Sequence, residues 1–254
     1  MKLSHLVKKA LATRLPGRAR HCVLCSHHPR YFLPYRQGTK SALMGTLDMI
    51  GSDIRNFECP YCGSHDRERH LFLYMQAMKL LEGMRNKSVL HVAPEKVLSG
   101  HIANAKPLHY VRCDLYPQTI GIMRIDILQM EFDSESFDVI IANHVLEHVA
   151  DDTRALHEIR RVLKKDGYAI LQTPYSQKLQ NTWQDSGITD KQARFQAYGQ
   201  EDHVRLYGSD IFNRFASAGF KPDIRTHSAL LPDIDAHLFG VNPREPMFLF
   251  YRAD

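Results

Sequence analysis

The chain has 254 residues, of which 44% are apolar and 24% are charged, so it can bury one sizeable core and still carry a small accessory module. No apolar run approaches the roughly 20 residues that a membrane-spanning helix needs, and no signal-peptide core precedes a small-residue cleavage site. These features argue against an integral membrane protein, and we expect a cytoplasmic location.

Positive charge is concentrated at the N-terminus. Nine of the 33 Lys and Arg residues lie within residues 1–40, which contain no Asp or Glu, although the net charge of the whole chain is only +5. Within residues 1–20, apolar side chains recur at helical spacing opposite lysines, so we expect a basic arm that is at least partly helical. Such an arm suits RNA, an anionic membrane surface that it contacts peripherally, or the protein's own domain.

Four of the five cysteines form two Cys-x-x-Cys pairs, Cys22 with Cys25 and Cys59 with Cys62. Each short turn can aim two thiolates at one point, which suits tetrahedral zinc, and four protein ligands would make the zinc structural. Disulfides are the weaker explanation in a reducing cytoplasm, and the thiols could instead be redox-active or simply buried in the core. Four nearby histidines could each replace a thiolate: His21, His27, His28 and His65.

Residues 65–83 follow the second cysteine pair and predict one helix, with an apolar stripe that lies in the core and ends near Gly83. Arg67, Arg69 and His70 at its start either point into a neighbouring site, where they could grip an anion, or form a solvated first turn. We assign residues 21–84 to a zinc-knuckle module with this connecting helix.

From residue 85 the pattern changes to short apolar strands that alternate with helical segments. This alternation is typical of a parallel sheet with helices on both faces, and we assign residues 85–254 to this domain, with a substrate lid at about 175–208. We expect strands at 88–92, 110–115, 137–143, 168–174, 219–227 and 245–253. The clearest helix covers 151–167, where Leu156, Ile159 and Leu163 form one face.

Polar residues stand at the ends of three predicted strands, where open α/β sheets bind ligands. Asp114 is placed to accept both ribose hydroxyls of an adenosine, and Asp126 to accept an adenine amino group. Taken alone, each aspartate is more ordinarily a turn residue or a helix cap. A nicotinamide dinucleotide is disfavoured because the chain has no G-x-G-x-x-G fingerprint.

Residues 126–174, DILQMEFDSESFDVIIANHVLEHVADDTRALHEIRRVLKKDGYAILQTP, resemble the central part of class I S-adenosylmethionine-dependent methyltransferases. The chain resembles more closely a bacterial branch of that superfamily with CPxCGSxxRxR in front, LHxAPE in place of the glycine-rich loop and GQxDHVRxYG downstream. The resemblance covers roughly residues 57–222. It implies a Rossmann-like class I methyltransferase sheet preceded by a small zinc-binding module, with S-adenosylmethionine as the cofactor.

The resemblance also implies a cofactor site, position by position. The first loop departs from the family because His91 replaces the usual acidic residue, and Ala93, Pro94 and Glu95 replace glycines. We expect a rebuilt loop in which Pro94 begins a helix whose amides bind the methionine carboxylate, while Glu95 pairs with the ammonium group. A degenerate, non-binding loop is the alternative. The remaining implied contacts are Asp114 at the ribose, Asp126 with the Ile127 backbone at the adenine, and Asn143 with His144 beside the methyl group.

Methyl transfer needs in-line placement of the acceptor and, for a hydroxyl acceptor, removal of a proton. Histidine is the best base near neutral pH, so His144 and His203 are the catalytic candidates. His148, Arg205 and Tyr207 are the candidates for acceptor binding. Arg205 could grip a phosphate or carboxylate, and a network that braces the lid is the alternative.

We therefore predict a methyltransferase that acts on an oxygen or nitrogen of a small-molecule or glycan-type acceptor. No Asn-Pro-Pro-Tyr-type base-methylation motif follows the third predicted strand. Two hypotheses compete with it: a zinc-containing RNA methyltransferase that uses the basic N-terminus, and a non-catalytic zinc scaffold with a degenerate methyltransferase fold.

Overall fold

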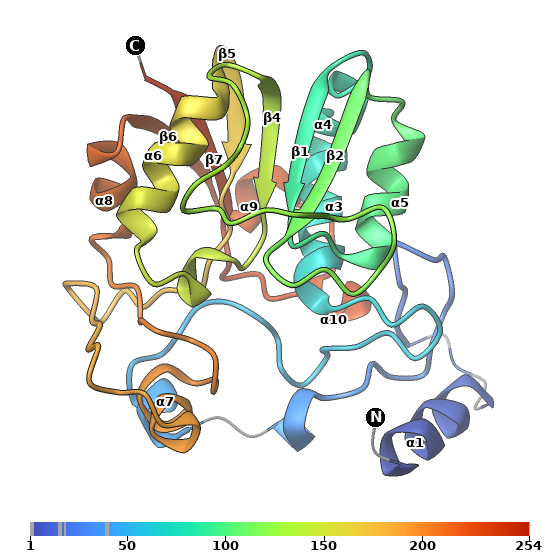
Figure 1. Cartoon of the computed structure of the whole chain (residues 1–254). Helices are drawn as coiled ribbons and strands as arrows, with labels where there is room; N and C mark the ends of the chain where they lie inside the picture. The colour runs from blue at the N-terminus through green and yellow to red at the C-terminus, as the bar shows by residue number, and fades with distance from the viewer. Residues whose placement is uncertain (1–2, 15–16, 18, 39–40, 254) are drawn as a thin grey trace.

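A seven-stranded sheet with strand order β3-β2-β1-β4-β5-β7-β6 organises the chain (Figure 1). The computed structural model describes residues 3–14, 17, 19–38 and 41–253. Strands β1 to β5 run parallel, and β7 is antiparallel to both of its neighbours. The strands are β1 (Ser88–Val92), β2 (His109–Asp114), β3 (Met123–Arg124), β4 (Phe137–Ala142), β5 (Leu163–Ile170), β6 (Phe220–Arg225) and β7 (Met247–Arg252).

The sheet confirms the predicted fold class and adds two corrections. Strand β3 was not predicted, because two residues are too short to show a periodicity. Strand β5 begins at Leu163, directly after α6, so Lys164 and Lys165 lie in a strand and not in the last turn of a helix.

Helices α1, α5 and α6 lie within segments for which a helix was predicted, but the helix expected over 65–83 is two helices. Helix α3 ends at Ala77, and Lys79 adopts a left-handed backbone with a φ of 55° before α4 begins. The helices are α1 (Leu3–Arg14), α2 (Ala42–Thr46), α3 (Asp66–Ala77), α4 (Leu80–Gly83), α5 (Lys96–Asn104), α6 (Asp152–Val162), α7 (Lys191–Tyr198), α8 (Ile211–Ser217), α9 (His227–Leu230) and α10 (Ala236–Phe239), with 3-10 turns η1 (Tyr35–Gly38) and η2 (Leu146–His148).

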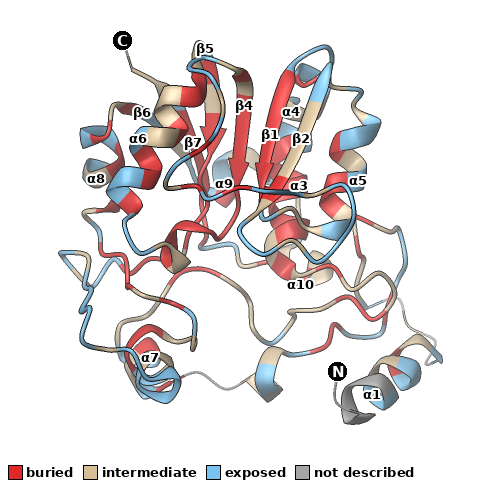
Figure 2. Ribbon diagram, in the orientation of Figure 1, coloured by how far each residue is buried: buried red, intermediate tan, exposed pale blue. Residues whose placement is uncertain are grey.

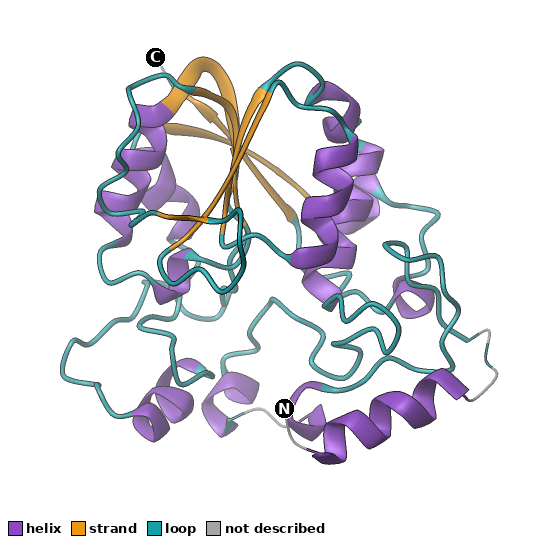
Figure 3. Cartoon of the chain, turned by 45° about the vertical axis from the view of Figure 1, so that its right-hand side comes forward, coloured by secondary structure: helices purple, strands orange, loops and turns teal. Residues whose placement is uncertain are grey.

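Helices cover both faces of the sheet (Figure 3). Successive side chains of a strand point to opposite faces, so alternate residues of the central strands enter two separate cores. Leu90 and Ile140 pack with α6 and α8, whereas Val89 and Ile141 pack with α3 and α5. The central strands β1 and β4 are accordingly buried, while the outer sides of the helices are exposed (Figure 2).

The predicted module of residues 21–84 packs directly on the sheet. Cys22 and Cys59 belong to the same hydrophobic cluster as Leu71 of α3 and Val139 of β4. Arg69 is fully buried, and its guanidinium donates hydrogen bonds to five backbone carbonyl oxygens, those of Asn56, Phe57, Ser64, Phe239 and Gly240. Arg69 therefore joins the module to the C-terminal part of the chain and is neither solvated nor free to bind a ligand.

The predicted basic arm is helical over α1, while residues 1, 2, 15, 16 and 18 lie outside the described residues. The helix is tethered through Lys9, whose Nζ lies 3.0 Å from Glu58 Oε1. Val7 and Leu11 are about half exposed on it, at 50% and 54%. Within the part of the chain that the structure describes, no helix combines the length and the apolar character needed to span a bilayer.

Candidate active site and four-cysteine cluster

Cys22, Cys25, Cys59 and Cys62 converge on one point, with their sulfur atoms within 4.8 Å of one another. Cys22 Sγ lies 3.7 Å from Cys62 Sγ, and Cys25 Sγ lies 3.8 Å from Cys59 Sγ. Zinc–sulfur bonds of about 2.3 Å in a tetrahedron place the sulfurs about 3.8 Å apart, so the cluster has the dimensions of a zinc site. The separations exclude disulfides, and no histidine joins this cluster among the described residues.

The loop after β1 contains a left-handed backbone conformation, which glycine usually adopts, at a residue that is not glycine. Ala93 has a φ of 47°, in the left-handed region, and its N–H donates to the carbonyl oxygen of Cys113 at 2.7 Å. Glu95 is the N-cap of α5, which begins at Lys96. Pro94 therefore precedes the helix, and the expectation that it forms the first helical residue needs this correction.

Glu95 is the centre of a buried network behind this loop. Its carboxylate accepts a hydrogen bond from Asn143 Nδ2 at 2.6 Å and lies 3.0 Å from His91 Nε2. His91 Nδ1 in turn lies 2.9 Å from the Tyr110 hydroxyl. Burial raises the pKa of Glu95, but the hydrogen bond and the charge of His91 outweigh it and leave the pKa below its ordinary value. The carboxylate is thus ionised, and each oxygen already has one partner.

Three buried polar atoms around Glu95 have no hydrogen-bond partner within the described residues: Arg67 Nε, Glu68 Oε2 and Asn143 Oδ1. Burial and the nearby Glu95 raise the pKa of Glu68 to about 8, with Arg67 acting in the opposite direction. A buried polar atom without a partner is costly, so these atoms point to an absent ligand. Glu68 is protonated at neutral pH with this pKa, but a bound ammonium group beside it would ionise it. A cation, an amide oxygen and such a carboxyl group match the carboxylate and ammonium groups of an amino acid, which is the form of the methionine end of S-adenosylmethionine.

Asp114 is the last residue of β2, and Asp126 follows the neighbouring strand β3. The two segments are adjacent, because the Ile125 N–H donates to the Asp114 carbonyl oxygen at 3.1 Å. Asp114 Oδ1 accepts from the Tyr116 N–H, and Asp126 Oδ1 accepts from the Leu128 N–H. Each carboxylate therefore accepts a hydrogen bond from the turn that follows it. The predicted roles at ribose and adenine stay predictions, with Asp126 exposed and Ile127 buried.

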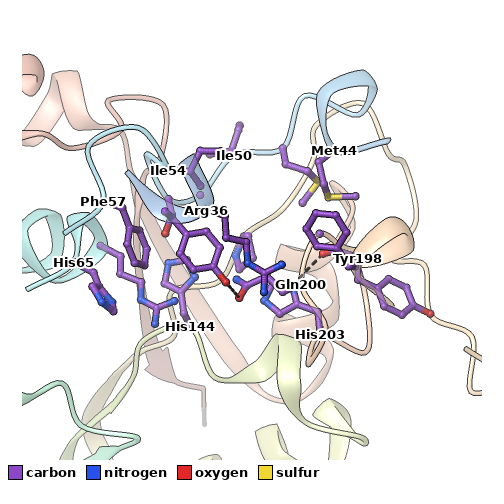
Figure 4. A pocket seen from close by; sticks show the side chains of 18 of the residues that line it. Arg36, Met44, Ile50, Ile54, Phe57, His65, His144, Tyr198, Gln200 and His203 are labelled. Carbon is purple, nitrogen blue, oxygen red and sulfur yellow. Dashed lines mark hydrogen bonds between the residues drawn. The ribbon is translucent and has the colours of Figure 1, made fainter. Parts of the chain in front are cut away.

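A cavity of about 520 Å³ lies beyond the carboxyl ends of β4 and β5, where His144 and Pro174 line it. Figure 4 shows the side chains of its wall. Its walls come from the segment between η1 and α3, from the lid around α7, and from His144. The lining combines apolar side chains, including Met44, Ile50, Phe57 and Phe195, with the polar side chains Arg36, His65, Arg67, His144 and His203.

His144 lies between two buried carboxylates. Its Nδ1 is 3.1 Å from Glu147 Oε1, and its Nε2 is 3.1 Å from Glu245 Oε1. Burial lowers the pKa of His144, but the two carboxylates outweigh this effect and raise it to about 9. At neutral pH the ring is a cation with both nitrogens engaged, so it has no lone pair with which to act as the general base predicted for it.

His203 differs from His144 in its charge and in its free ring nitrogen. Its ring is 4% exposed, and Nδ1 lies 3.1 Å from the carbonyl oxygen of Tyr198, which makes Nδ1 the donor. Nε2 is buried without a hydrogen-bond partner among the described residues. Burial lowers the pKa of His203 to about 4, so the ring is neutral and carries a free lone pair at neutral pH.

Arg205 and Tyr207 lie in a brace beside the cavity, and not in its wall. The Arg205 guanidinium donates to the carbonyl oxygens of Leu146, Val149 and Ala150 and to Gln184 Oε1. The Tyr207 hydroxyl donates to Asp152 Oδ2 at 2.7 Å. These two predicted acceptor contacts therefore have their hydrogen-bonding capacity used inside the protein, and the bracing alternative describes them. His148 packs edge-on against the His203 ring, with 4.7 Å between centroids.

Two site residues were missed from the sequence. Glu68 sits at the third position of α3 and accepts the His65 N–H at 2.9 Å, a capping-box position that could have been recognised. Glu245 lies in the irregular segment before β7, where no sequence pattern marks it. Its link to His144 exists only in the folded chain.

Comparison with known proteins matches part of the chain to a family model. Residues 96–171 match the family model described as a methyltransferase domain. No curated protein matches the chain.

Solved structures with a similar fold include a candidate S-adenosylmethionine-dependent methyltransferase from Listeria monocytogenes, 10% identical with a TM-score of 0.49, where the match covers 73% of this chain and 100% of that one. An S-adenosylmethionine-dependent methyltransferase from Mesorhizobium loti is 14% identical, with a TM-score of 0.48 and coverages of 71% and 98%. The 1,6-didemethyltoxoflavin-N1-methyltransferase of Burkholderia thailandensis is 13% identical, with a TM-score of 0.47 and coverages of 72% and 79%. Residues 96–171 therefore match a methyltransferase domain, and the strand order β3-β2-β1-β4-β5-β7-β6 is typical of the class I methyltransferase fold.

Proposed function

We propose that the protein transfers a methyl group to an oxygen or nitrogen of a small or sugar-like acceptor that binds in the 520 Å³ cavity. The observation that carries this proposal is the position of the cavity between the lid, His144 and the unpartnered polar atoms near Glu95. Its volume is in the range of pockets that enclose small ligands. A recess of this kind suits a compact acceptor better than a strand of RNA, which needs an extended basic groove.

The cofactor site that we propose combines predicted and newly found residues. Arg67 would pair with the methionine carboxylate, and Glu68 and Asn143 Oδ1 would accept from the ammonium group. Asp114 and Asp126 keep their proposed places at ribose and adenine. Bound S-adenosylmethionine supplies an electrophilic methyl group on a sulfonium. In this proposal Glu95 orders Asn143 and His91 and does not bind the ammonium group directly.

The acceptor side is proposed from the cavity wall. The polar lining includes Arg36, Glu58 and His65, while Met44 and Phe57 make much of the remaining surface apolar. Burial lowers the pKa of His65 to about 4, so its ring is neutral, and Arg36 pairs with Glu201. His203 carries the lone pair that could take a proton from an acceptor hydroxyl. His144, as a buried cation, orients Glu147 and Glu245.

Zinc at the four-cysteine cluster is proposed as a structural ion. The sulfur separations fit it, and the Ser64 hydroxyl lies 3.1 Å from Cys62 Sγ, where it can donate to the thiolate. Because Cys59 and α3 share one cluster with the sheet, the ion would also hold Arg67 and Glu68 in place.

Calorimetric titration with S-adenosylmethionine and with S-adenosylhomocysteine tests the proposed function. We expect the zinc-loaded wild type to bind both, and Arg67→Met and Asp114→Ala each to weaken binding about tenfold or more, as the loss of a charged hydrogen bond predicts. Arg85→Met and Asp166→Ala, at exposed positions away from the site, are the matched controls. A folded, zinc-loaded protein that binds neither compound would overturn the proposal. Methylation assays with RNA and with small hydroxyl or amine acceptors then separate the acceptor classes.

A further inference from the structure

A second group of potential metal ligands lies next to the cavity. One ligand atom each from Glu147, His148 and His203 lies within 4.8 Å of the other two. Glu147 and His203 are 1% and 4% exposed, and His148 is half-buried. Apart from the four cysteines, this is the only such group in the described part of the chain. The set, two imidazoles and one carboxylate, differs chemically from the thiolate cluster.

Hydrogen bonds within the protein orient both imidazoles. His203 Nδ1 lies 3.1 Å from the carbonyl oxygen of Tyr198, and His148 Nδ1 lies 3.2 Å from that of Asp202. In each ring Nδ1 therefore donates, and Nε2 is left with its lone pair. Metal-bound histidines are commonly arranged in this way, because a hydrogen bond to the second nitrogen sets the tautomer and the ring orientation.

The lone pair of His203 is an independent sign of a missing partner. Nε2 is buried and has no hydrogen-bond partner among the described residues. Leaving such an acceptor unsatisfied destabilises the folded protein. Because the ring also lines the cavity, a ligand can reach it (Figure 4).

The carboxylate of Glu147 is held in a matching way. One oxygen lies 3.1 Å from His144 Nδ1, and the other accepts from the Thr173 hydroxyl at 3.0 Å. Each oxygen keeps a further lone pair. Carboxylates that bind metals are often hydrogen-bonded to neighbouring groups in this manner.

We infer that Glu147, His148 and His203 bind one divalent ion of the manganese-to-zinc series at the edge of the acceptor cavity. Imidazole and carboxylate ligands suit these ions, and three protein ligands leave positions open for another molecule. The open positions would face the proposed acceptor, so the role of the ion rests on the proposed function, whereas its binding does not. With the ion bound, His203 is a ligand and not a free base, and the ion would polarise an acceptor oxygen.

Metal binding by the full-length, zinc-loaded protein tests this inference. After dialysis against a weak chelator, the protein is titrated with Co²⁺ and with Mn²⁺, followed by calorimetry and by metal content per chain. We expect one equivalent beyond the zinc in the wild type. His203→Gln and His148→Gln should each weaken its binding about tenfold or more, because each removes a ligand. His157→Gln, on the exposed side of α6, is the control and should bind like the wild type.

His148 is half-buried, so its variant keeps the test valid if substitution of the buried His203 disturbs folding, which circular dichroism would reveal. A wild type that takes up no metal beyond the zinc would overturn the inference, as would wild-type affinity in both variants. Titration of the protein with S-adenosylmethionine, after metal has been removed from the second site, tests cofactor binding independently of metal binding. Metal binding without cofactor binding would refute the proposed function and leave this metal site standing.

Discussion

Cys22 and Cys25 lie in one tight turn and Cys59 and Cys62 in another, so half of the geometry of the four-cysteine cluster is set within each four-residue segment. The Glu147-His148-His203 cluster is assembled differently. Its first two residues are neighbours on η2, and the third arrives from the lid, far along the chain. The difference teaches that ligands supplied by local turns can be recognised from their spacing in the sequence. Ligands that distant segments bring together in the fold cannot.

The two clusters also differ in what holds them. The cysteines are part of the core that α3 shares with the sheet. The second cluster depends on the brace of Arg205, Tyr207 and Asp152, which fastens the segment carrying His203 to the turn after η2. Substitutions in the first should therefore unfold the protein, and substitutions in the second should change binding.

The largest effect should come from the first cluster. In Cys59→Ser we expect loss of zinc and a fall of several kcal/mol in the free energy of unfolding, because structural zinc contributes directly to folding. Zinc analysis and thermal unfolding measured by circular dichroism provide the test. His148→Gln should keep the zinc and unfold near the wild-type temperature. Full zinc content and an unchanged unfolding temperature in Cys59→Ser would remove the distinction between the clusters.

Two arginines on α3 should differ in their contribution to stability, which gives the next largest expected effect. Arg69→Met should cost about 3 kcal/mol or more, because five carbonyl oxygens, two of them in fully buried hydrogen bonds, lose their donor. Arg67→Met, two residues earlier on the same helix, should change stability by only about 0.5 kcal/mol. Urea denaturation of both variants measures the difference. Equal losses would mean that Arg67 also serves the fold and not the cofactor.

Asp152→Asn should loosen the brace of the second cluster. Asp152 is 1% exposed and pairs with Arg214, with Arg205 3.7 Å away, so we expect a loss of about 3 kcal/mol from breaking a buried ion pair. The measurement is urea denaturation at neutral pH, with affinity for the second metal as a further readout. Asp151→Asn, at the exposed N-cap of α6, is the neighbouring control and should cost only about 0.5 kcal/mol, because Asn caps a helix about as well as Asp.

The same aspartate predicts a dependence on pH. Burial raises the pKa of Asp152, but the hydrogen bond from Arg214, the charge of Arg205 and the hydrogen bond from Tyr207 together hold it below its ordinary value. A lowered pKa in the folded state means that the stabilisation is complete above the unfolded pKa of about 3.9 and is lost as the pH falls through the folded value. The stability difference between wild type and Asp152→Asn should therefore shrink below about pH 4. A difference that stays constant into strong acid would contradict the ion-pair assignment.

The smallest effect concerns the backbone alone. Ala93→Gly should stabilise the protein by about 1 kcal/mol, because Ala93 holds a left-handed φ of 47° that glycine adopts without strain. Differential scanning calorimetry should show a rise of about 2–4 °C in the unfolding temperature. Affinity for S-adenosylmethionine should remain, since the polar side chains near Glu95 are untouched. A lower unfolding temperature would show that the side chain of Ala93 matters more than its backbone.

The sequence by itself determined the class of sheet, six of its seven strands and the four-cysteine cluster. The physical reason is that apolar periodicity and tight turns are local, so a few consecutive residues carry the whole signal. Where the signal was too short or conflicting, it failed. Strand β3 has two residues, the helix over 65–83 breaks at a left-handed Lys79, and the lysines after Val162 resemble a helix end although they begin β5.

Tertiary structure alone decided what the polar residues of the site can do. Histidine at position 144 suggested a base, but Glu245, from the other end of the domain, holds it as a cation. Arg205 suggested an anion-binding residue, but its guanidinium donates to backbone carbonyl oxygens of η2 and the turn that follows. His203 keeps a free lone pair because Tyr198 engages only its Nδ1. A residue type says which chemistry is available, while its charge state and free atoms depend on partners that only folding brings within hydrogen-bonding distance.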